Sequence, residues 1–334
     1  MESHFHPFLT RVLNRTDYRL IQLAGDASAR RYYRIAGGDR TWVLMVWEPF
    51  KANEYPFLSV HRHFQASHVF VPEVVSFSEE EGLVLLEDLG DLTLERKFWE
   101  NQNPEMVIPY YEKALDELVK IHFLTLRNNI NSTAVRTQFD TEKFIWEFNY
   151  CREHLLVQLC QLTLNPEQEE VLRATFTSIS QRLHSEPKWI SHRDYHSRNL
   201  MIKLDQVRVI DFQDARRGPL PYDLVSLLRD SYVQIPDDMA EGLVRTFKEK
   251  AKPYLPKDFS SEHFDLMYEL QTVQRCFKAC GSFSSFWNTR KDTRYLKYIS
   301  STLRRVLKSL YYFPEYRDFG NFLLDSGLLE RKFE

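Results

Sequence analysis

Alternating apolar and polar positions dominate residues 1–90 and predict β-strands. The runs YRLIQLAG, RRYYRIAGG and RTWVLMVW are rich in β-branched and aromatic residues, and short turns containing Gly and Asp separate them. The stretch NEYPFLSVHRHFQAS has the spacing of a helix, whereas EVVSFSEEEGLVLLEDL has the form of a further hairpin. Residues 1–90 are therefore expected to form an antiparallel sheet accompanied by one helix.

Helical periodicity replaces this pattern after Gly90. Apolar residues recur at helix spacing over 108–122, and again after Asn165, which has the sequence of a helix cap followed by Pro166. Only NLMIKL and VRVIDF interrupt the helical half, where they predict two short strands. The expected fold class is α+β, with a small β-rich lobe over 1–88, a connector near 86–90 and a larger, mainly helical lobe over 91–334.

Composition narrows the class of protein without identifying its chemistry. The formal net charge is −3 over 334 residues, which does not suggest a nucleic-acid or membrane-surface binder, and no protein partner is predicted. No apolar run approaches the roughly 20 residues that a membrane-spanning helix needs. The four cysteines form no CxxC pair, so we expect reduced thiols packed on helices in a cytoplasmic protein.

The stretch ISHRDYHSRNLMIKLDQVRVIDFQDA, residues 190–215, places charged side chains beside apolar runs that favour burial. If its two short strands pair as a hairpin, Asn199 before the first strand and Asp211 after the second lie side by side. An amide oxygen and a carboxylate are hard ligands suited to Mg²⁺. Asp194, shortly before Asn199, is close to that metal but free to face a substrate. This combination is what phosphoryl transfer requires.

The motif HRDYHSRN, followed by VIDFQDARRGPLPYDLVSLLRD, resembles the aminoglycoside phosphotransferase and choline kinase superfamily, whose bilobal fold is similar to that of protein kinases. The resemblance extends over most of the chain. Gln213 stands where protein kinases carry the Gly of D-F-G, which favours a small-molecule kinase. AGDASARRYYRI, LLEDLGD and QRCFKACGSF further resemble the anomeric sugar kinases of bacterial cell-wall recycling, which use ATP to phosphorylate the C1 hydroxyl of N-acetylmuramate and N-acetylglucosamine.

The resemblance implies a role for each matching position. Asp194 corresponds to the catalytic base, and Asn199 and Asp211 correspond to the ligands of Mg²⁺ on the phosphates of ATP. His192 and Asp223 correspond to residues that brace the catalytic loop. The remaining cofactor positions are the backbone of the lobe connector, at Glu87 and Leu89, and a nucleotide-covering turn formed by Gly25, Asp26, Ala27 and Ser28.

One strand departs from the superfamily. The third strand reads WVLMVW and contains no Lys to grip the phosphates of ATP. The neighbouring strand offers replacements, with Arg30 and Arg34 on one face and Arg31 on the other. Arg30 and Arg31 are assigned to cofactor binding on this ground, although arginines that only solvate the strand would give the same pattern. Glu54 is expected on the helix of this lobe, where the partner of that Lys normally lies.

The acceptor is expected in the helical lobe, facing Asp194. The segment QTVQRCFKACGSF places Gln271, Arg275 and Lys278 on one helical face. Such a face could bind hydroxyls, an acetamido group or the lactyl carboxylate of N-acetylmuramate, although a solvated helix face would look the same. Arg216, after the second strand of the hairpin, either reaches the substrate or fixes the loop.

Two other interpretations remain open at this point. The acceptor could instead be choline, homoserine or an aminoglycoside. Arg275 and Lys278 oppose a cationic acceptor, but Trp287 and many Phe residues would accommodate one. A nucleotide-binding pseudokinase would explain the absent strand Lys, but it would not need the base and both magnesium ligands together.

Overall fold

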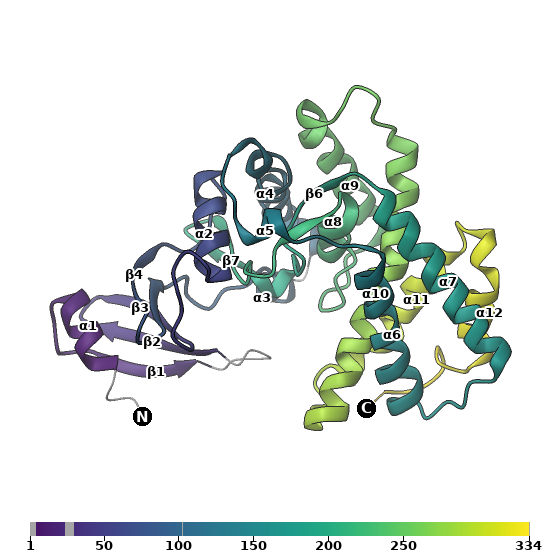
Figure 1. The fold of residues 1–334 in the computed structure, drawn as a ribbon, viewed down its shortest axis with the longest axis horizontal. Coiled ribbons are helices and arrows are strands. Elements are labelled where there is room, and N and C mark those ends of the chain that lie inside the picture. The colour runs from purple at the N-terminus through teal and green to yellow at the C-terminus, as the bar shows by residue number, and fades with distance from the viewer. Residues whose placement is uncertain (1–4, 24–29, 102, 334) are drawn as a thin grey trace.

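An antiparallel sheet of five strands forms the first lobe in the computed structural model, which describes residues 5–23, 30–101 and 103–333 (Figure 1). This confirms the sheet that the alternating pattern predicts. In the order β1-β2-β3-β5-β4, its strands are β1 (Arg19–Leu23), β2 (Arg31–Gly37), β3 (Arg40–Val46), β4 (Val74–Ser78) and β5 (Leu83–Glu87).

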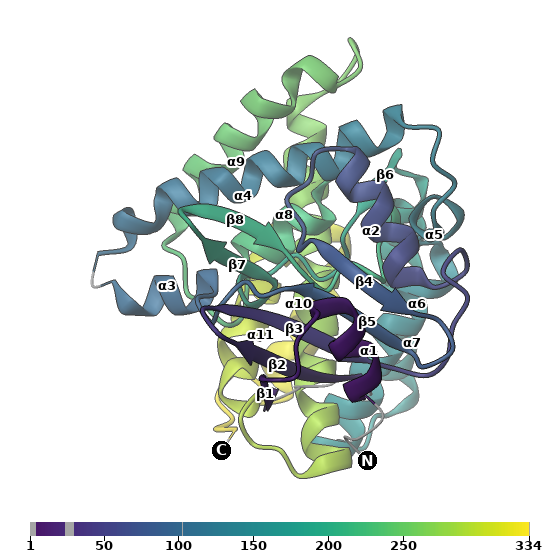
Figure 2. The same ribbon diagram turned by 90° about the vertical axis from the view of Figure 1, so that its left-hand side faces the viewer.

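The two faces of this sheet have different neighbours. Helix α1 (Phe5–Leu13) covers one face, as Figure 2 shows, because Phe5 and Phe8 align on one side of the helix. Tyr33 and Ile35 of β2 point into that contact and are buried. Successive strand residues point to opposite faces, so Tyr32 and Arg34 face the second lobe. The sequence patterns above did not predict α1.

Helix α2 (Pro56–Ala66) belongs to the first lobe in sequence but packs against the second. The Phe57 ring stacks on Phe212 with 5.0 Å between centroids. His63 bonds through its two ring nitrogens to Thr125 O at 2.8 Å and Ser132 Oγ at 2.7 Å, and it is fully buried. A single apolar core therefore runs from α2 into the helical lobe.

Glu54 does not lie on α2, so that prediction is wrong. The helix begins at Pro56, whose fixed φ suits the first helical turn and whose missing N–H needs no partner there. Glu54 stays in the preceding turn, where it is exposed and lies 3.7 Å from Lys51.

The second lobe is mainly helical, as predicted, and holds two small two-stranded sheets. The first sheet pairs β6 (Lys188–Ser191) with β9 (Arg216–Pro219), and the second pairs β7 (Leu200–Lys203) with β8 (Gln206–Val209). The helices are α3 (Leu94–Glu100), α4 (Ile108–Val119), α5 (Thr133–Arg136), α6 (Thr141–Cys151), α7 (Pro166–Ser185), α8 (Pro221–Leu228), α9 (Asp237–Ala251), α10 (Ser261–Arg290), α11 (Ile299–Leu310) and α12 (Arg317–Asp325).

Helix α10 runs through the second lobe and is buried along most of its 30 residues. Gly281 lets it approach α6 closely, because a Cβ there would lie 2.5 Å from Cys151 Cα. All four cysteines are buried free thiols, as expected for thiols packed on helices. Within the described ranges, no helix has the length and apolarity to cross a membrane.

Candidate active site

The loop between β6 and β7 is fixed by a buried carboxylate. Asp223, on the first turn of α8, accepts hydrogen bonds from the backbone N–H groups of His192 at 2.6 Å and Arg193 at 2.9 Å. Burial raises the pKa of Asp223 to about 7 although these two donors oppose the shift. The His192 ring bonds to Ile210 O at 2.9 Å, and Arg193 has φ of 87°. These contacts suit a bracing role for His192 and Asp223.

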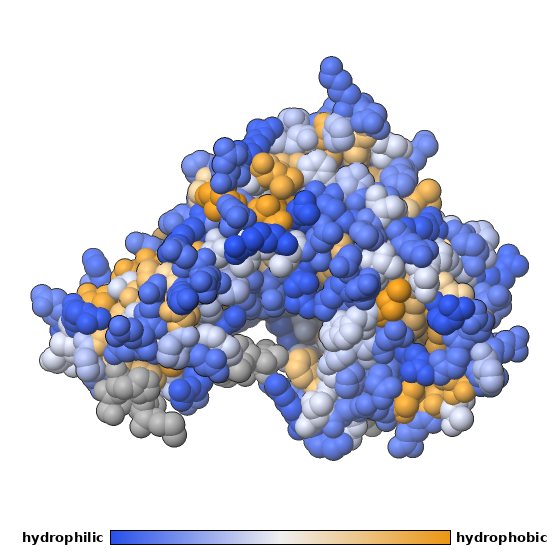
Figure 3. All heavy atoms as spheres, in the orientation of Figure 1, coloured by the Kyte–Doolittle hydropathy of each residue, from blue (hydrophilic) through white to orange (hydrophobic). Residues whose placement is uncertain are grey.

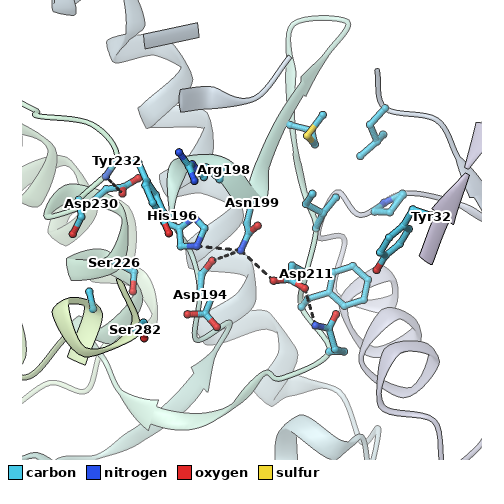
Figure 4. Close-up of a pocket in the computed structure, with 18 of the residues that line it drawn as sticks. Tyr32, Asp194, His196, Arg198, Asn199, Asp211, Ser226, Asp230, Tyr232 and Ser282 are labelled. Atoms are coloured by element: carbon cyan, nitrogen blue, oxygen red, sulfur yellow. Dashed lines mark hydrogen bonds between the residues drawn. The ribbon is translucent and has the colours of Figure 1, made fainter. Parts of the chain in front are cut away.

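The hairpin of β7 and β8 brings its two ends together, because Leu200 pairs with Val209. Asn199 Nδ2 lies 3.4 Å from Asp211 Oδ2 and donates a hydrogen bond of 2.9 Å to the backbone oxygen of Asp194 (Figure 4). The three polar residues that the sequence singles out thus meet at one point. Burial raises the pKa of Asp211, and a hydrogen bond from Gln213 opposes this.

Asp194 faces two cations of α10. Arg275 Nη2 lies 3.4 Å and Lys278 Nζ lies 3.6 Å from Asp194 Oδ1. Burial raises the pKa of Asp194, but Lys278, Arg275 and Arg193 together outweigh it, so the pKa lies well below its usual range. The face of α10 carrying these cations is buried rather than solvated, and the Gln271 side chain donates to Gln274 within the core.

A cleft of about 590 Å³ contains these groups and opens between the lobes. Figure 3 shows the molecule hollowed between the sheet on the left and the helices on the right. One wall comes from Tyr32, Val43 and residues 86–91, and the other from the loop between β6 and β7, α8 and α10. In Figure 4, Tyr32 lies on the Asp211 side, whereas Ser226 and Ser282 lie on the Asp194 side.

The connector between the lobes is held by side chains, and the backbone N–H of Leu89 is open to the cleft. Lys203 Nζ bonds to Glu87 Oε1 at 2.8 Å and to Asp88 O at 2.7 Å. The Asp88 carboxylate accepts from Gly90 N at 2.9 Å. Among the described residues, none accepts a hydrogen bond from the N–H of Leu89, which lines the cleft. This N–H can meet a ring nitrogen of a bound base.

The arginines of the β2 region lie in three different environments. Arg34 faces the cleft, but ion pairs of 2.6 Å with Asp88 and 3.0 Å with Asp91 hold it at the connector. Arg31 is exposed on the α1 face and is not brought to the cleft. Arg30 is half-buried, with its guanidinium 5.5 Å from the Trp47 ring, and its charge lowers the pKa of Asp211 against the larger effect of burial.

Other positions singled out in the sequence are not brought into the cleft. Arg216 lies outside it, with its guanidinium 5.3 Å from the Phe139 ring and its Nε bonded to Asp214 O at 3.2 Å. This arrangement fixes the loop after Asp211. On β3, the position of the missing phosphate-gripping Lys corresponds to Met45 or Val46, and both of these side chains are buried. The turn of Gly25, Asp26, Ala27 and Ser28 lies outside the described residues.

Arg198 lines the cleft and was missed in the sequence. Arg198 forms a bidentate pair with Glu95 at 2.9 and 3.0 Å. Its guanidinium also lies 3.8 Å from the centroid of Tyr232 and 5.7 Å from that of Tyr295. Its position between Asp194 and Asn199 in the sequence was a signal that it lies at the cleft. Its aromatic partners lie far along the chain, so the sequence could not show the cage they form.

Comparison with known proteins decides the family. The model described as the phosphotransferase enzyme family matches residues 19–255. The chain belongs to the phosphotransferase enzyme family. A relative from Neisseria meningitidis named N-acetylmuramate/N-acetylglucosamine kinase is 31% identical, with 89% of this chain and 90% of the relative covered. A Pseudomonas aeruginosa relative of the same name is 28% identical, with 91% and 87% covered. The predicted resemblance and the phosphotransferase class are confirmed.

Solved structures of phosphotransferases share the fold. Choline kinase LicA from Streptococcus pneumoniae superposes with a TM-score of 0.62 at 15% identity, covering 94% of this chain and 99% of that one. ADP-bound aminoglycoside phosphotransferase APH(2'')-Ib gives 0.59 at 15% identity, covering 91% and 98%. The kinase-like bilobal fold is therefore confirmed, and a phosphotransferase of this fold binds a nucleotide.

Proposed function

We propose that the protein transfers the γ-phosphoryl group of ATP to the anomeric C1 hydroxyl of N-acetylmuramate or N-acetylglucosamine. The observation that carries this proposal is the similarity to three relatives named as kinases of these two sugars, at 28–31% identity. The aligned regions cover 89–92% of this chain and 87–90% of the relatives, so both lobes and the α10 face are included.

ATP would lie on the connector side of the cleft, with adenine against the Leu89 N–H and the phosphates directed toward Asp211. The donor set there fits Mg²⁺, which takes one or two protein oxygens and completes its shell with water and phosphate. Asn199 and Asp211 offer those oxygens, and the described residues contain no cluster of three or more acidic, His or Cys ligands for a tighter site. Bound Mg²⁺ would neutralise phosphate charge.

Asp194 would orient the acceptor hydroxyl and take its proton. The C1 oxygen forms the new bond to phosphorus, the bond from phosphorus to the β,γ-bridging oxygen breaks, and ADP leaves with that electron pair. General-base assistance contributes about 10²–10⁴-fold. Positioning of donor and acceptor contributes roughly 7–11 kcal/mol. An anomeric hydroxyl is more acidic than an ordinary alcohol. It can therefore give its proton to a carboxylate whose negative charge two cations already stabilise.

The cleft favours a neutral or anionic acceptor over choline or an aminoglycoside. A cationic ligand needs an aromatic cage or a carboxylate without a partner. The guanidinium of Arg198 already makes cation–π contacts with the rings of Tyr232 and Tyr295. On the acceptor side, Asp194 faces two cations and Asp230 accepts from Ser197 and Tyr232.

A panel of acceptors tests the proposed function. Purified protein with MgATP would be assayed for ADP release with N-acetylmuramate, N-acetylglucosamine, glucose, choline and kanamycin. We expect turnover with the two amino sugars and none above background with the two cations, and ³¹P–¹H correlation should place the phosphate on C1. Turnover of choline or kanamycin alone, or phosphate on another hydroxyl, would contradict the proposal.

Arg30, rather than Arg31, should supply the charge that β3 lacks. We expect Arg30→Ala to raise the KM for ATP by about tenfold, the size of one lost charge-assisted hydrogen bond. Arg31→Ala is the matched control, because it removes the same charge from the opposite, exposed face, and its KM for ATP should stay within about twofold of wild type. Equal effects in steady-state kinetics of both variants would end this assignment.

A further inference from the structure

The cationic side chains that line the cleft fall into two groups. Three form ion pairs with carboxylates away from Asp194: Arg34 with Asp88, Arg198 with Glu95 and Arg229 with Asp237. The other two, Arg275 and Lys278, both face Asp194 Oδ1. Their charges are thus directed at the carboxylate that would hold the acceptor hydroxyl.

Arg275 and Lys278 are anchored so that their charged ends stay at this point. They lie one turn apart on α10, whose backbone is fixed by close packing at Gly281. Arg275 Nε donates to Ser226 Oγ at 2.9 Å, which leaves Nη2 to face Asp194. Within the described chain, Lys278 Nζ has no carboxylate other than Asp194 within ion-pair distance, and its side chain is only 14% exposed.

Asp194 is the carboxylate within ion-pair distance of both cations, and the buried Glu147 carboxylate, farther away, also raises the pKa of both. Burial nevertheless lowers the pKa of Lys278 overall, so burying this second charge costs free energy that the two carboxylates offset only in part. That cost would be offset further once a phosphoryl group passes between the nucleotide and the acceptor, because negative charge then spreads over its equatorial oxygens. The five strands of the sheet contain no lysine, and Arg30 is assigned above to ATP binding, so Arg275 and Lys278 are the cations that face Asp194.

We propose that Lys278, with Arg275 beside it, is a catalytic residue that stabilises the phosphoryl group during its transfer. This inference rests on the proposed function and adds a role to it. The acceptor oxygen bonds to phosphorus, its proton goes to Asp194, and the electron pair of the broken P–O bond leaves with ADP. Lys278 and Arg275 donate hydrogen bonds to the moving phosphoryl oxygens and are unchanged at the end.

Substitution of Lys278 separates this role from sugar binding. We expect Lys278→Met to lower kcat by about 10²–10³-fold, the size of one preorganised electrostatic donor, while the KM values for sugar and ATP stay within about threefold. Lys278→Arg should recover part of the loss. Lys257→Met, which removes a positive charge from an exposed position of the same lobe, should behave as wild type.

A second measurement does not depend on turnover. The affinity for MgADP with sugar would be measured by calorimetry with and without aluminium fluoride, which mimics the phosphoryl group in transfer. The wild-type protein should bind MgADP more tightly when aluminium fluoride is present. In Lys278→Met this increase in affinity should be smaller by about 10²-fold or more, while the affinity for MgADP and sugar without aluminium fluoride should be unchanged.

Three results would overturn the proposed role of Lys278. These are a kcat for Lys278→Met within about threefold of wild type, a tenfold higher KM for sugar with unchanged kcat, or an unchanged aluminium fluoride gain. If the wild-type protein phosphorylated neither amino sugar, the proposed acceptor would be refuted but the proposed role of Lys278 would not. Lys278→Met would then be compared with wild type on whichever panel alcohol is phosphorylated, or on slow transfer to water.

Discussion

Replacing Asp194 with asparagine is expected to lower kcat by about 10²–10⁴-fold, because the amide cannot accept the proton of the acceptor hydroxyl. Asparagine keeps the size of the side chain, and the loop is fixed by Asp223 rather than by Asp194. The affinity for MgADP should therefore stay close to that of wild type. Steady-state kinetics and calorimetry of the same preparation test both expectations.

An exposed carboxylate serves as the control for Asp194→Asn. Asp258 lies on the surface before α10, and Asp258→Asn makes the same chemical change away from the cleft. It should leave kcat unchanged. If Asp194→Asn kept a kcat within about fivefold of wild type, Asp194 would not be the catalytic base.

Asp211→Asn is expected to lower activity at millimolar Mg²⁺ by on the order of 10³-fold, because a carboxylate that holds the metal contributes several kcal/mol of charge stabilisation. Asn199 alone would remain to hold the metal, so the Mg²⁺ concentration for half-maximal rate should rise by at least about tenfold. Titration of the rate with Mg²⁺ at fixed ATP measures both changes.

ADP binding by the same variant in the absence of Mg²⁺ serves as the control for Asp211. Without Mg²⁺, Asp211→Asn should bind ADP as wild type does, because the connector at Leu89 is untouched. A rate that depends on Mg²⁺ in the same way before and after the substitution would exclude Asp211 as a ligand.

Local signals made the scaffold of the site predictable. The runs NLMIKL and VRVIDF are short, β-rich and separated by a tight turn, so their pairing fixes where Asn199 and Asp211 meet. The helix after Asn165 begins where its cap predicts, with a full capping box to Gln168. In both cases the contacts that decide the structure join residues close together in the sequence.

Contacts between distant segments could not be predicted. Helix spacing placed Arg275 and Lys278 on one face, but only the packing of α10 shows that the face is buried against Asp194. Strand alternation separated Arg30 from Arg31, but which face meets the cleft depends on α1 covering the other. Arg198 was missed because its aromatic partners come from separate parts of the helical lobe.

The attachment of α2 to the helical lobe limits how the two halves can move. His63 bonds to Thr125 and Ser132, and the backbone N–H of Thr133 donates to Ser59 Oγ at 3.1 Å. Any rotation of the first lobe that widens the cleft for substrate must either break these bonds or leave α2 attached to the helical lobe. A rotation of the strands alone would keep these bonds; it would bend the chain at both ends of α2 as well as at Gly90 and would break the contact of Lys203 with Glu87 at the end of β5. The moving part would then be the sheet without α2. Substitutions in the two segments that flank α2 would therefore change the rate of ADP release.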